Sequence, residues 1–559
     1  MIVFRTLMRG RTCSRWAAVI LCLTVGTICA HAIAGRKSSL PGMADANGTA
    51  RSAMRPDVLQ LQARIDSLLG EVLPDGSHSQ RGYWGILIAD RDTGETLYSQ
   101  NEDHFFTPAS NGKLFTTALA LALLGPDYRF RTTLESKGTM GSDGRLGGDL
   151  LLVGRGDPDL SNRKFPYDKK SDTDGPVDKI LAEMADAAVA KGLKEIDGDV
   201  VGDDSYFPYD PYPEGWSVGD LFFRFGAPVS AIAFNDNTLS VEMRPGASPG
   251  EPPAIAVEPA AAADTFGVEL AMVSAGDKSD FAVVRQPATN FLLLRGTISP
   301  GHARMRIDLA MPDPVKTAAG ELKGLLEARG VRVRGGIRVQ HGAPPRTTAN
   351  GEPILTPVDA AAVAGNSTVL AEHVSQPLIE IVRITNKVSQ NLHAELLLRT
   401  VGREKVGAGS TAAGLEAEKD FLKGAGIADG DVVLSDGSGL SRDDLVTPRA
   451  VGALLNYAVK QPWGAAFVST LPVAGVDGTL ENRMKNSAAT GFIEAKTGAA
   501  DHARALSGYA TTRGGEYLVF SIFVNNNAQH GTDATGTLDA IATAMTETLG
   551  ATAAAKSRR

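Results

Sequence analysis

The order of hydrophobic and polar positions predicts helices and a hairpin in the first part of the chain. Apolar residues recur at helical spacing over residues 57–72. Two strand-like runs, 83–89 and 95–99, flank a turn rich in Asp, Thr and Gly and predict a β-hairpin. An Ala- and Leu-rich helix is expected over residues 113–124, with Thr107 as its N-cap and a proline in its first turn.

The pattern changes in the middle of the chain and returns to helices near the end. From about residue 130 to 355, short strand-like runs alternate with Gly- and Pro-rich turns, and residues 246–263 are expected to be a loop. Helical periodicity returns after residue 366. The other predicted segments are strands at 150–153, 199–201, 291–294, 505–510 and 517–524, and a helix at 535–549. Helix-rich ends around a strand-rich middle indicate one domain split by a large insertion.

The first 34 residues are expected to be a signal peptide, followed by a flexible linker over residues 35–56. Four arginines precede an apolar run at 16–29, and Ala30-His31-Ala32 supplies the small residues of a cleavage site. The run is shorter than the ~20 residues that span a bilayer, and a retained anchor is the alternative. All three cysteines of the chain lie in this segment. The exported protein is therefore expected to have no disulfide and no thiolate metal site.

Composition and charge exclude some classes of binding partner. The chain has 559 residues, of which 43% are hydrophobic, so it can bury a sizeable core. Removing the four arginines of the leader moves the formal charge from −8 to −12. No basic stripe interleaved with aromatics is present, so no nucleic acid is expected as a partner. No later segment resembles a membrane-spanning helix, so no integral membrane anchor is expected after signal cleavage.

Three short motifs carry the candidate chemistry. They are S-x-x-K at Ser110–Lys113, S-x-N at Ser389–Asn391 and K-T-G at Lys496–Gly498. Each alone recurs by chance in a chain of this length. All three in this order, with the first at a helix start and the third before a strand, form the motif set of penicillin-binding proteins and serine β-lactamases.

The residues of the first motif indicate a chemical mechanism on their own. Residues at i and i+3 of a helix share a face, so the Lys113 amine can reach the Ser110 hydroxyl. A serine needs an adjacent base to become a nucleophile, and a lysine serves as that base only when its pKa is depressed. A second lysine, Lys496, is expected to help depress it. The backbone N–H groups of Ser110 and Ala499 are expected to form an oxyanion hole.

Longer strings resemble one family within this group. They are T-P-A-S at 107–110, D-G-S-G-L-S-R at 436–442, G-V-D-G-T-L at 475–480, L-S-G-Y at 506–509, and G-D-D-S-Y-F at 202–207 with F-N-D-N at 234–237 in the insertion. On these strings the chain resembles the D-alanyl-D-alanine carboxypeptidase/endopeptidase family, the class C low-molecular-mass penicillin-binding proteins (peptidase family S13). The 279-residue interval from Ser110 to Ser389 also suits this family, which carries two extra domains there.

The resemblance implies an α+β fold, with an antiparallel sheet between helix layers as in penicillin-binding proteins and serine β-lactamases. The DD-peptidase domain is expected at 57–136 and 355–550, and two inserted β-rich subdomains at 137–354. The implied activity is that of a periplasmic serine DD-peptidase that cleaves D-Ala-D-Ala termini, D-Ala–diaminopimelate cross-links, or both. The implied partners are peptidoglycan stem peptides, with β-lactam antibiotics as covalent inhibitors and with no cofactor and no metal.

The resemblance also assigns roles to residues. Ser110 is the acyl-accepting nucleophile and Lys113 its general base. Ser389 relays a proton to the leaving amine, Asn391 binds the substrate amide, and Lys496 supports the relay. The other implied substrate-binding residues are Thr497, Gly498 and Ala499.

An acidic residue of the insertion and an arginine contact the side chain of the stem peptide in relatives. The matching positions here are expected to be Asp203 and Arg442, which would hold the zwitterionic end of diaminopimelate. A loop Asp and a solvated Arg are the structural alternatives for the two. The chain departs from relatives at Ala499, Asp501 and Asp444, which bears on substrate preference rather than on acyl transfer.

Other functions fit the sequence less well. The histidines show no H-E-x-x-H helix, so a zinc peptidase is not expected. Ser438 in Asp-Gly-Ser-Gly fails the G-x-S-x-G pattern and is expected to serve a turn. A serine β-lactamase and a non-catalytic cell-wall binding protein are the remaining alternatives. The long insertion argues against the first, and the intact motif residues argue against the second.

Overall fold

The computed structural model describes residues 55–70, 81–264, 267–276, 278–285, 291–301, 304–355, 367–527 and 532–550. The predicted signal peptide, and the predicted linker up to residue 54, lie outside these residues. Within the described part of the chain, no helix is both long and apolar enough to cross a membrane.

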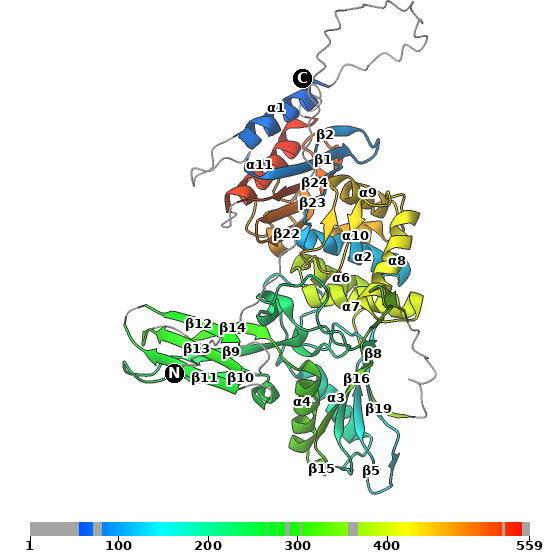
Figure 1. Ribbon diagram of the computed structural model, residues 1–559, viewed down its shortest axis with the longest axis vertical. Helices are drawn as coiled ribbons and strands as arrows, with labels where there is room; N and C mark the ends of the chain where they lie inside the picture. Colours follow the sequence, from blue (N-terminus) through cyan, green and yellow to red (C-terminus); the bar gives the residue numbers. More distant parts are fainter. Residues whose placement is uncertain are drawn as a thin grey trace, which may run out of the picture. The chain divides into compact units, whose positions relative to one another are not determined.

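A five-stranded antiparallel sheet brings the two ends of the chain together (Figure 1). Its strands, in spatial order, are β2 (Thr96–Gln100), β1 (Tyr83–Asp90), β24 (Tyr517–Asn525), β23 (Ala503–Thr511) and β22 (Ile493–Ala500). Every neighbouring pair is antiparallel. The predicted hairpin and both predicted C-terminal strands are therefore confirmed. The strand with the K-T-G motif, β22, lies at the edge of the sheet.

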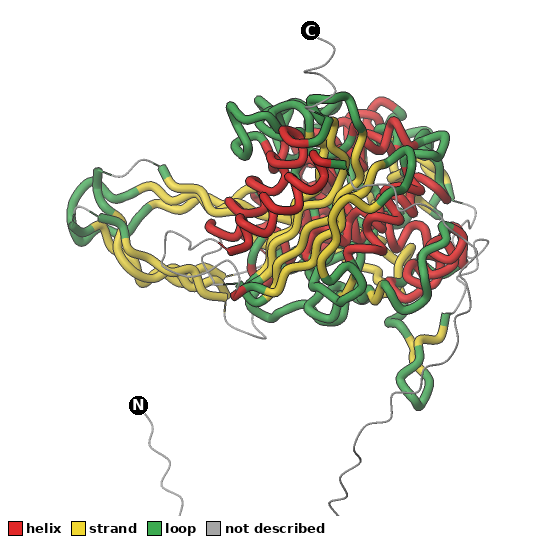
Figure 2. The backbone as a smooth tube through the Cα atoms, turned by 90° about the horizontal axis from the view of Figure 1, so that it is seen from above, coloured by secondary structure: helices red, strands yellow, loops and turns green. Residues whose placement is uncertain are grey.

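Helices cover both faces of this sheet, as the tube view shows (Figure 2). One face packs against α1 (Pro56–Gly70) and α11 (Thr532–Thr548). The other packs against α2 (Lys113–Leu123), α6 (Leu378–Lys387), α7 (Asn391–Val401), α8 (Thr411–Gly424), α9 (Pro448–Ala458) and α10 (Gly464–Ser469). The predicted helices at both chain ends are confirmed, although Val72 lies outside the described residues. The predicted α+β class, with a sheet between helix layers, is also confirmed.

The pattern of β24 explains why a single strand serves two cores. Successive side chains point to opposite faces, so Phe520 and Ile522 join the cluster under α1 and α11, whereas Val519 and Phe523 join the cluster under α2 and α9. All four are at most 2% exposed. A strand covered on both faces shows a continuous hydrophobic run instead of alternation, which is the pattern of residues 517–524.

The insertion contains a mixed sheet with its own helices. The sheet order is β16 (Ile337–Gly342), β8 (Val200–Pro208), β6 (Leu150–Val153), β3 (Arg131–Ser136) and β19 (Thr368–Val374). A smaller sheet consists of β15 (Arg332–Val333), β7 (Glu195–Ile196), β5 (Arg145–Gly147) and β4 (Thr139–Met140). Helices α3 (Lys179–Ala190) and α4 (Pro314–Ala328) share one apolar cluster with these strands. Because β6 and β8 are parallel, α3 lies on the crossover between them.

A second group of strands interrupts the first along the chain. It follows β8 and precedes α4, and it forms two three-stranded sheets. These strands are β9 (Thr238–Arg244), β10 (Ala254–Glu258) and β14 (Met305–Ala310) in one sheet, and β11 (Gly267–Ser274), β13 (Phe291–Ile298) and β12 (Asp280–Arg285) in the other. Short two-stranded pairs complete the fold: β17 (Arg346–Thr347) with β18 (Pro353–Ile354), and β20 (Val432–Val433) with β21 (Leu445–Val446).

Strand pairing corrects three expectations. The expected insertion boundaries at 137 and 354 are too narrow, because β3 and β19 pair with each other inside the insertion's sheet. The insertion is not only β-rich, since it includes α3, whose buried Leu181, Met184, Ala185 and Ala188 follow helical spacing. The expected loop at 246–263 contains β10 and a short 3₁₀ turn at 260–264, because β10 completes the sheet of β9.

Candidate active site

The serine of the first motif lies in a tight turn at the start of α2. Ser110 belongs to a 3₁₀ turn, Ala109–Gly112, that runs directly into the helix. Ala109 has a left-handed φ of 48°, a conformation that costs an L-residue roughly 1–2 kcal/mol. Gly439 packs on it so closely that a Cβ at Gly439 would lie 1.8 Å from the Ala109 carbonyl oxygen. The expected cap is corrected, because Pro108 precedes the turn, Gly112 precedes α2, and no side chain caps either start. The Thr107 N–H donates to Asn525 Oδ1 at 2.8 Å.

Lys113 lies beneath the serine with its amine fully enclosed. Its Nζ is 2.9 Å from Ser110 Oγ, 2.6 Å from Asn391 Oδ1 and 2.6 Å from the carbonyl oxygen of Ser438. An ammonium group can donate to all three, whereas a neutral amine can donate to two of them and accept from the Ser110 hydroxyl. One amine thus joins the first motif, the second motif and the D-G-S-G loop.

Ser389 and Lys496 form a second hydroxyl–amine pair in the same cleft. Lys496 Nζ donates to Ser389 Oγ at 2.9 Å and to the carbonyl oxygen of Thr497 at 2.9 Å. Ser389 has a left-handed φ of 61°, in the corner between α6 and α7. Asn391, the first residue of α7, donates from Nδ2 to the carbonyl oxygen of Phe225 in the insertion, at 2.8 Å. The predicted residues of all three motifs therefore meet in one place.

The K-T-G strand forms one wall of the cleft. A Cβ on Gly498 would lie 2.5 Å from the Pro108 carbonyl oxygen, so only glycine permits this approach of the strand to the serine turn. Thr497 Oγ1 donates to Thr479 Oγ1 at 2.9 Å, and Ala499 is exposed. β22 is an edge strand, but Ile493 and Ala495 already hydrogen-bond to the loop at Pro472–Ala474, so an extended peptide can pair with this edge only beyond Ala495.

Burial lowers the pKa of both lysine side chains. Lys113 and Lys496 are 0% exposed, and none of the ion pairs among the described residues includes either amine. Desolvation lowers the pKa of Lys113 to about 8, and nearby acidic groups oppose that shift. Desolvation and the charge of Lys113 lower the pKa of Lys496 well below its ordinary value. Burial is thus the main cause of the lowered pKa at Lys113, and the expected contribution of Lys496 is not among the causes.

A group of buried carboxyls behind Lys113 was not predicted from the sequence. Burial raises the pKa of Glu395 to about 8 and that of Glu418 to about 8, and it raises the pKa of Asp444 well above its ordinary value. Glu395 and Glu418 are therefore largely protonated near neutral pH. A neutral carboxyl attracts a proton on Lys113 less than a carboxylate does, which favours a neutral amine.

Asp436 shapes the loop that presents an acceptor to Lys113. It is 1% exposed and accepts hydrogen bonds from five N–H donors. These donors are the backbone N–H groups of Ser438, Gly439, Leu440 and Ser441 and the indole N–H of Trp216. The indole comes from the insertion, so Asp436 also ties the two parts of the molecule together. Ser438 serves this turn, as its sequence context suggested.

Arg442 lines the cleft, whereas Asp203, the other residue expected to hold the diaminopimelate end, is not among the residues that line it. Asp203 lies in β8, where it accepts from Gln340 Nε2 at 2.9 Å and from the Ser205 N–H at 3.0 Å. Arg442 Nη2 instead lies 3.5 Å from Asp220 Oδ2 and 3.5 Å from Asp501 Oδ2.

The course of the backbone explains why Arg442 contacts Asp220 and not Asp203. Strand pairing holds Asp203 between β6 and β16, whereas the loop after β8 packs on the loop of Arg442, whose N–H donates to the Gly215 carbonyl oxygen at 3.0 Å. Asp220 follows in that loop. The sequence offered no motif at position 220, so only the fold reveals this residue.

A buried ion pair supports the corner of Ser389. Lys387 Nζ lies 2.6 and 2.7 Å from the two carboxylate oxygens of Asp477, and its side chain is 4% exposed. Asp477 belongs to the G-V-D-G-T-L string that also supplies Thr479. The string was noted in the sequence, but this contact across the cleft required the fold.

The cleft between these elements has a volume of about 470 Å³. Ser110, Ser389, Asn391 and Thr497 line it, together with Asp220 and Arg442 at one end. A hydroxyl beside a desolvated amine can attack a carbonyl, and a second hydroxyl–amine pair can deliver a proton to the group that leaves. The arrangement suits acyl transfer.

Comparisons with known proteins agree with this chemistry. The model of the D-Ala-D-Ala carboxypeptidase 3 (S13) family matches residues 62–356 and 346–546. A D-alanyl-D-alanine carboxypeptidase of Actinomadura sp. (strain R39) is 34% identical over 521 residues, which cover 91% of this chain and 87% of that protein. The D-alanyl-D-alanine carboxypeptidase DacB of Haemophilus influenzae is 28% identical, with 82% of this chain and 87% of that protein covered.

Solved structures give the same result. The crystal structure of penicillin binding protein 4 (dacB) from Haemophilus influenzae superposes with a TM-score of 0.70 at 25% identity, covering 86% of this chain and 98% of that chain. A structure of that protein complexed with a novel β-lactam superposes with a TM-score of 0.66 over the same shares of both chains.

Proposed function

Because this chain belongs to the D-Ala-D-Ala carboxypeptidase 3 (S13) family of serine peptidases, we propose that it hydrolyses peptidoglycan peptides through an acyl-enzyme on Ser110. Its substrates are D-Ala-D-Ala termini and D-Ala–diaminopimelate cross-links, and its site of action is the periplasm. The observation that carries the proposal is the chain of contacts from Ser110 Oγ through Lys113 Nζ to Asn391, beside the contact of Ser389 with Lys496.

Acylation begins when the neutral Lys113 amine accepts the Ser110 proton. Ser110 Oγ then attacks the carbonyl carbon of the penultimate D-Ala, and the resulting oxyanion receives hydrogen bonds from the N–H groups of Ser110 and Ala499. The C–N bond breaks as the departing amine takes the hydroxyl proton of Ser389, with Lys496 supporting that hydroxyl. Ser389 regains a proton at the expense of the protonated Lys113, which leaves Lys113 neutral for the second half. Water attacks the ester in the second half, with Lys113 again as the base.

The far end of the cleft fits the third residue of a stem peptide. Arg442 lies between two carboxylates, Asp220 and Asp501, so this end offers both a cation and anions. A free diaminopimelate side chain carries an ammonium and a carboxylate on one carbon and can pair with both. Asp220 thus takes the role that the sequence had suggested for Asp203.

Substrate assays test the proposal. The wild-type protein should release D-Ala from a pentapeptide ending in D-Ala-D-Ala, and faster when diaminopimelate stands at the third position than when an uncharged residue does. It should also form a covalent adduct with a fluorescent penicillin that persists for many minutes. Rapid release of hydrolysed penicillin without peptide cleavage would support a β-lactamase instead, and failure to react with either reagent would contradict enzymatic acyl transfer.

The rate of acylation should rise with pH. A general base acts in its neutral form, and the pKa of Lys113 is lowered to about 8. The second-order rate of penicillin acylation should therefore rise about tenfold per pH unit below pH 7 and level off above about pH 9. Stopped-flow labelling between pH 6 and 9.5 measures this curve. A rate that is flat across that range would contradict the role of Lys113 as the base.

A further inference from the structure

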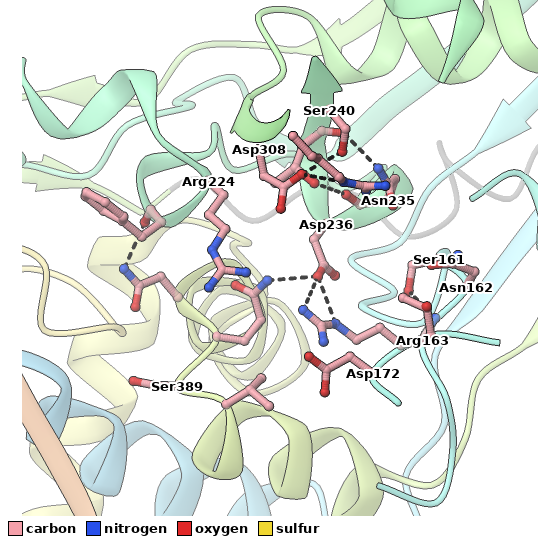
Figure 3. Close-up of a pocket in the computed structure, with 17 residues that line it drawn as sticks. Ser161, Asn162, Arg163, Asp172, Arg224, Asn235, Asp236, Ser240, Asp308 and Ser389 are labelled. Carbon is pink, nitrogen blue, oxygen red and sulfur yellow. Dashed lines mark hydrogen bonds and ion pairs between the residues drawn. The ribbon is translucent and has the colours of Figure 1, made fainter. Parts of the chain in front are cut away.

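A second pocket of about 320 Å³ lies beyond Ser389, between the insertion and the start of α7 (Figure 3). Its walls come from the segments around Arg163, Arg224, Asp236 and Arg306 and from the S-x-N motif. The catalytic roles proposed above use none of these four side chains. The pocket therefore needs an explanation of its own.

This pocket opens from the catalytic cleft. Ser389, Asn391 and Phe225 line both spaces, whereas Ser110 lines only the cleft. A substrate that leads away from Ser110 and past Ser389 therefore enters the second pocket. In the proposed reaction, Ser389 protonates the leaving amine, so the part of the substrate that passes it is the departing one.

The floor of the pocket is a network of hydrogen-bonded polar side chains around Asp236. Asp236 is 8% exposed and accepts from Arg163 Nε at 2.8 Å and from Gln390 Nε2 at 2.9 Å. Its other oxygen lies 3.0 Å from Nε2 of His393. Gln390 and His393 flank Asn391, so this carboxylate of the insertion also supports the corner that presents Ser389.

Arg224 differs from the other arginines of the pocket. Arg163 pairs with Asp236, and Arg306 lies 3.1 Å from Asp308 and 3.3 Å from Glu258. Among the described residues, no carboxylate lies within ion-pair distance of the Arg224 guanidinium. Figure 3 shows Arg224 extending toward the space between Ser389 and Asp236, with Asp172 on the far side beside Arg163. A cation is thus available to a ligand just beyond the catalytic serine pair.

We propose that this pocket binds the departing strand of a cross-linked peptide and that Arg224 pairs with a carboxylate of that strand. The inference rests on the proposed function. The strand released from a D-Ala–diaminopimelate cross-link continues past the scissile amide and carries several carboxylates, whereas the group released from a D-Ala-D-Ala terminus is a single amino acid. The pocket would therefore serve endopeptidase cleavage and be dispensable for carboxypeptidase cleavage.

Arg224→Ala tests this division with two substrates. On a cross-linked peptide dimer, kcat/KM should fall about tenfold, mainly through KM, because one charge-assisted hydrogen bond is lost. On the D-Ala-D-Ala pentapeptide, kcat/KM should stay within about twofold. Arg224→Lys should recover part of the loss on the dimer. A matched control, Arg332→Ala, removes an exposed arginine of a distant sheet and should leave both rates unchanged.

A dimer whose departing strand carries amides in place of carboxylates identifies the contact. The wild type should cleave it about tenfold more slowly than the acidic dimer, and Arg224→Ala should add no further loss. Equal losses on pentapeptide and dimer, no loss on the dimer, or a wild type that cleaves pentapeptide but not dimer would each overturn the pocket's role. A wild type that cleaves neither peptide and does not react with penicillin would instead overturn the proposed function itself.

Discussion

Ser110→Ala should abolish covalent labelling by a fluorescent penicillin and lower kcat for the D-Ala-D-Ala pentapeptide by about 10⁴-fold or more. The substitution removes the only atom that forms the acyl bond. The effect on folding should be small, because the change removes one hydroxyl from a half-buried position and leaves the turn backbone intact. Gel fluorescence, peptide hydrolysis and thermal unfolding measure the three quantities.

Ser438→Ala is the matched control for the nucleophile. Ser438 lies in the adjacent loop, and its hydroxyl contacts Asp436 at 3.0 Å. This variant should still be labelled, with a loss of stability of about 1 kcal/mol. Labelling of Ser110→Ala together with loss of labelling in Ser438→Ala would move the nucleophile to the loop.

Lys113→Met should lower the rate of acylation by penicillin about 10³- to 10⁴-fold, the range for loss of a general base. Methionine fills similar space without a charge, so the buried position should tolerate it. The cost to folding is the set of acceptors left without a donor, chiefly Asn391 Oδ1 and the Ser438 carbonyl oxygen, at about 1–3 kcal/mol. Rapid-mixing kinetics and denaturant unfolding measure both effects.

The residual rate at which penicillin acylates Lys113→Met should also lose its pH dependence. If Lys113 is the base, the residual acylation of Lys113→Met should be nearly flat from pH 6 to 9. The exposed Lys137→Met serves as the control and should keep the wild-type curve. A Lys113→Met protein that retains the rising limb would assign the titration to another group, with Lys496 the next to test.

Most of the acyl-transfer site could be predicted from the sequence, because its parts are short local patterns. S-x-x-K places Ser110 and Lys113 on one helical turn, and K-T-G precedes a strand, 505–510, that is hydrophobic enough to recognise. The contacts that join the motifs, such as Lys113 with Asn391 and Lys496 with Ser389, follow from the resemblance in order and spacing. No local sequence pattern predicts these contacts by itself.

The residues that were missed act across long separations. Asp220 contacts Arg442 from a different domain, and Asp436 accepts the indole N–H of Trp216 across 220 positions. Burial of Glu395 likewise depends on the packing of α7 against the D-G-S-G loop. Amphipathic spacing would have found α3, whereas β3 and β19 were assigned to the wrong domain because pairing partners cannot be inferred from a single strand.

The order of the strands in the catalytic sheet has a consequence for synthesis. β1 is made early but pairs with β24, and the wall beside Ser110 is β22, so both partners emerge from the ribosome more than 370 residues after Ser110. Until they arrive, the Lys113 amine has no closed surroundings to exclude water, and it keeps its proton as a free lysine does. A chain cut short before residue 493 is thus chemically silent, because it lacks the strand that closes the site around the nucleophile.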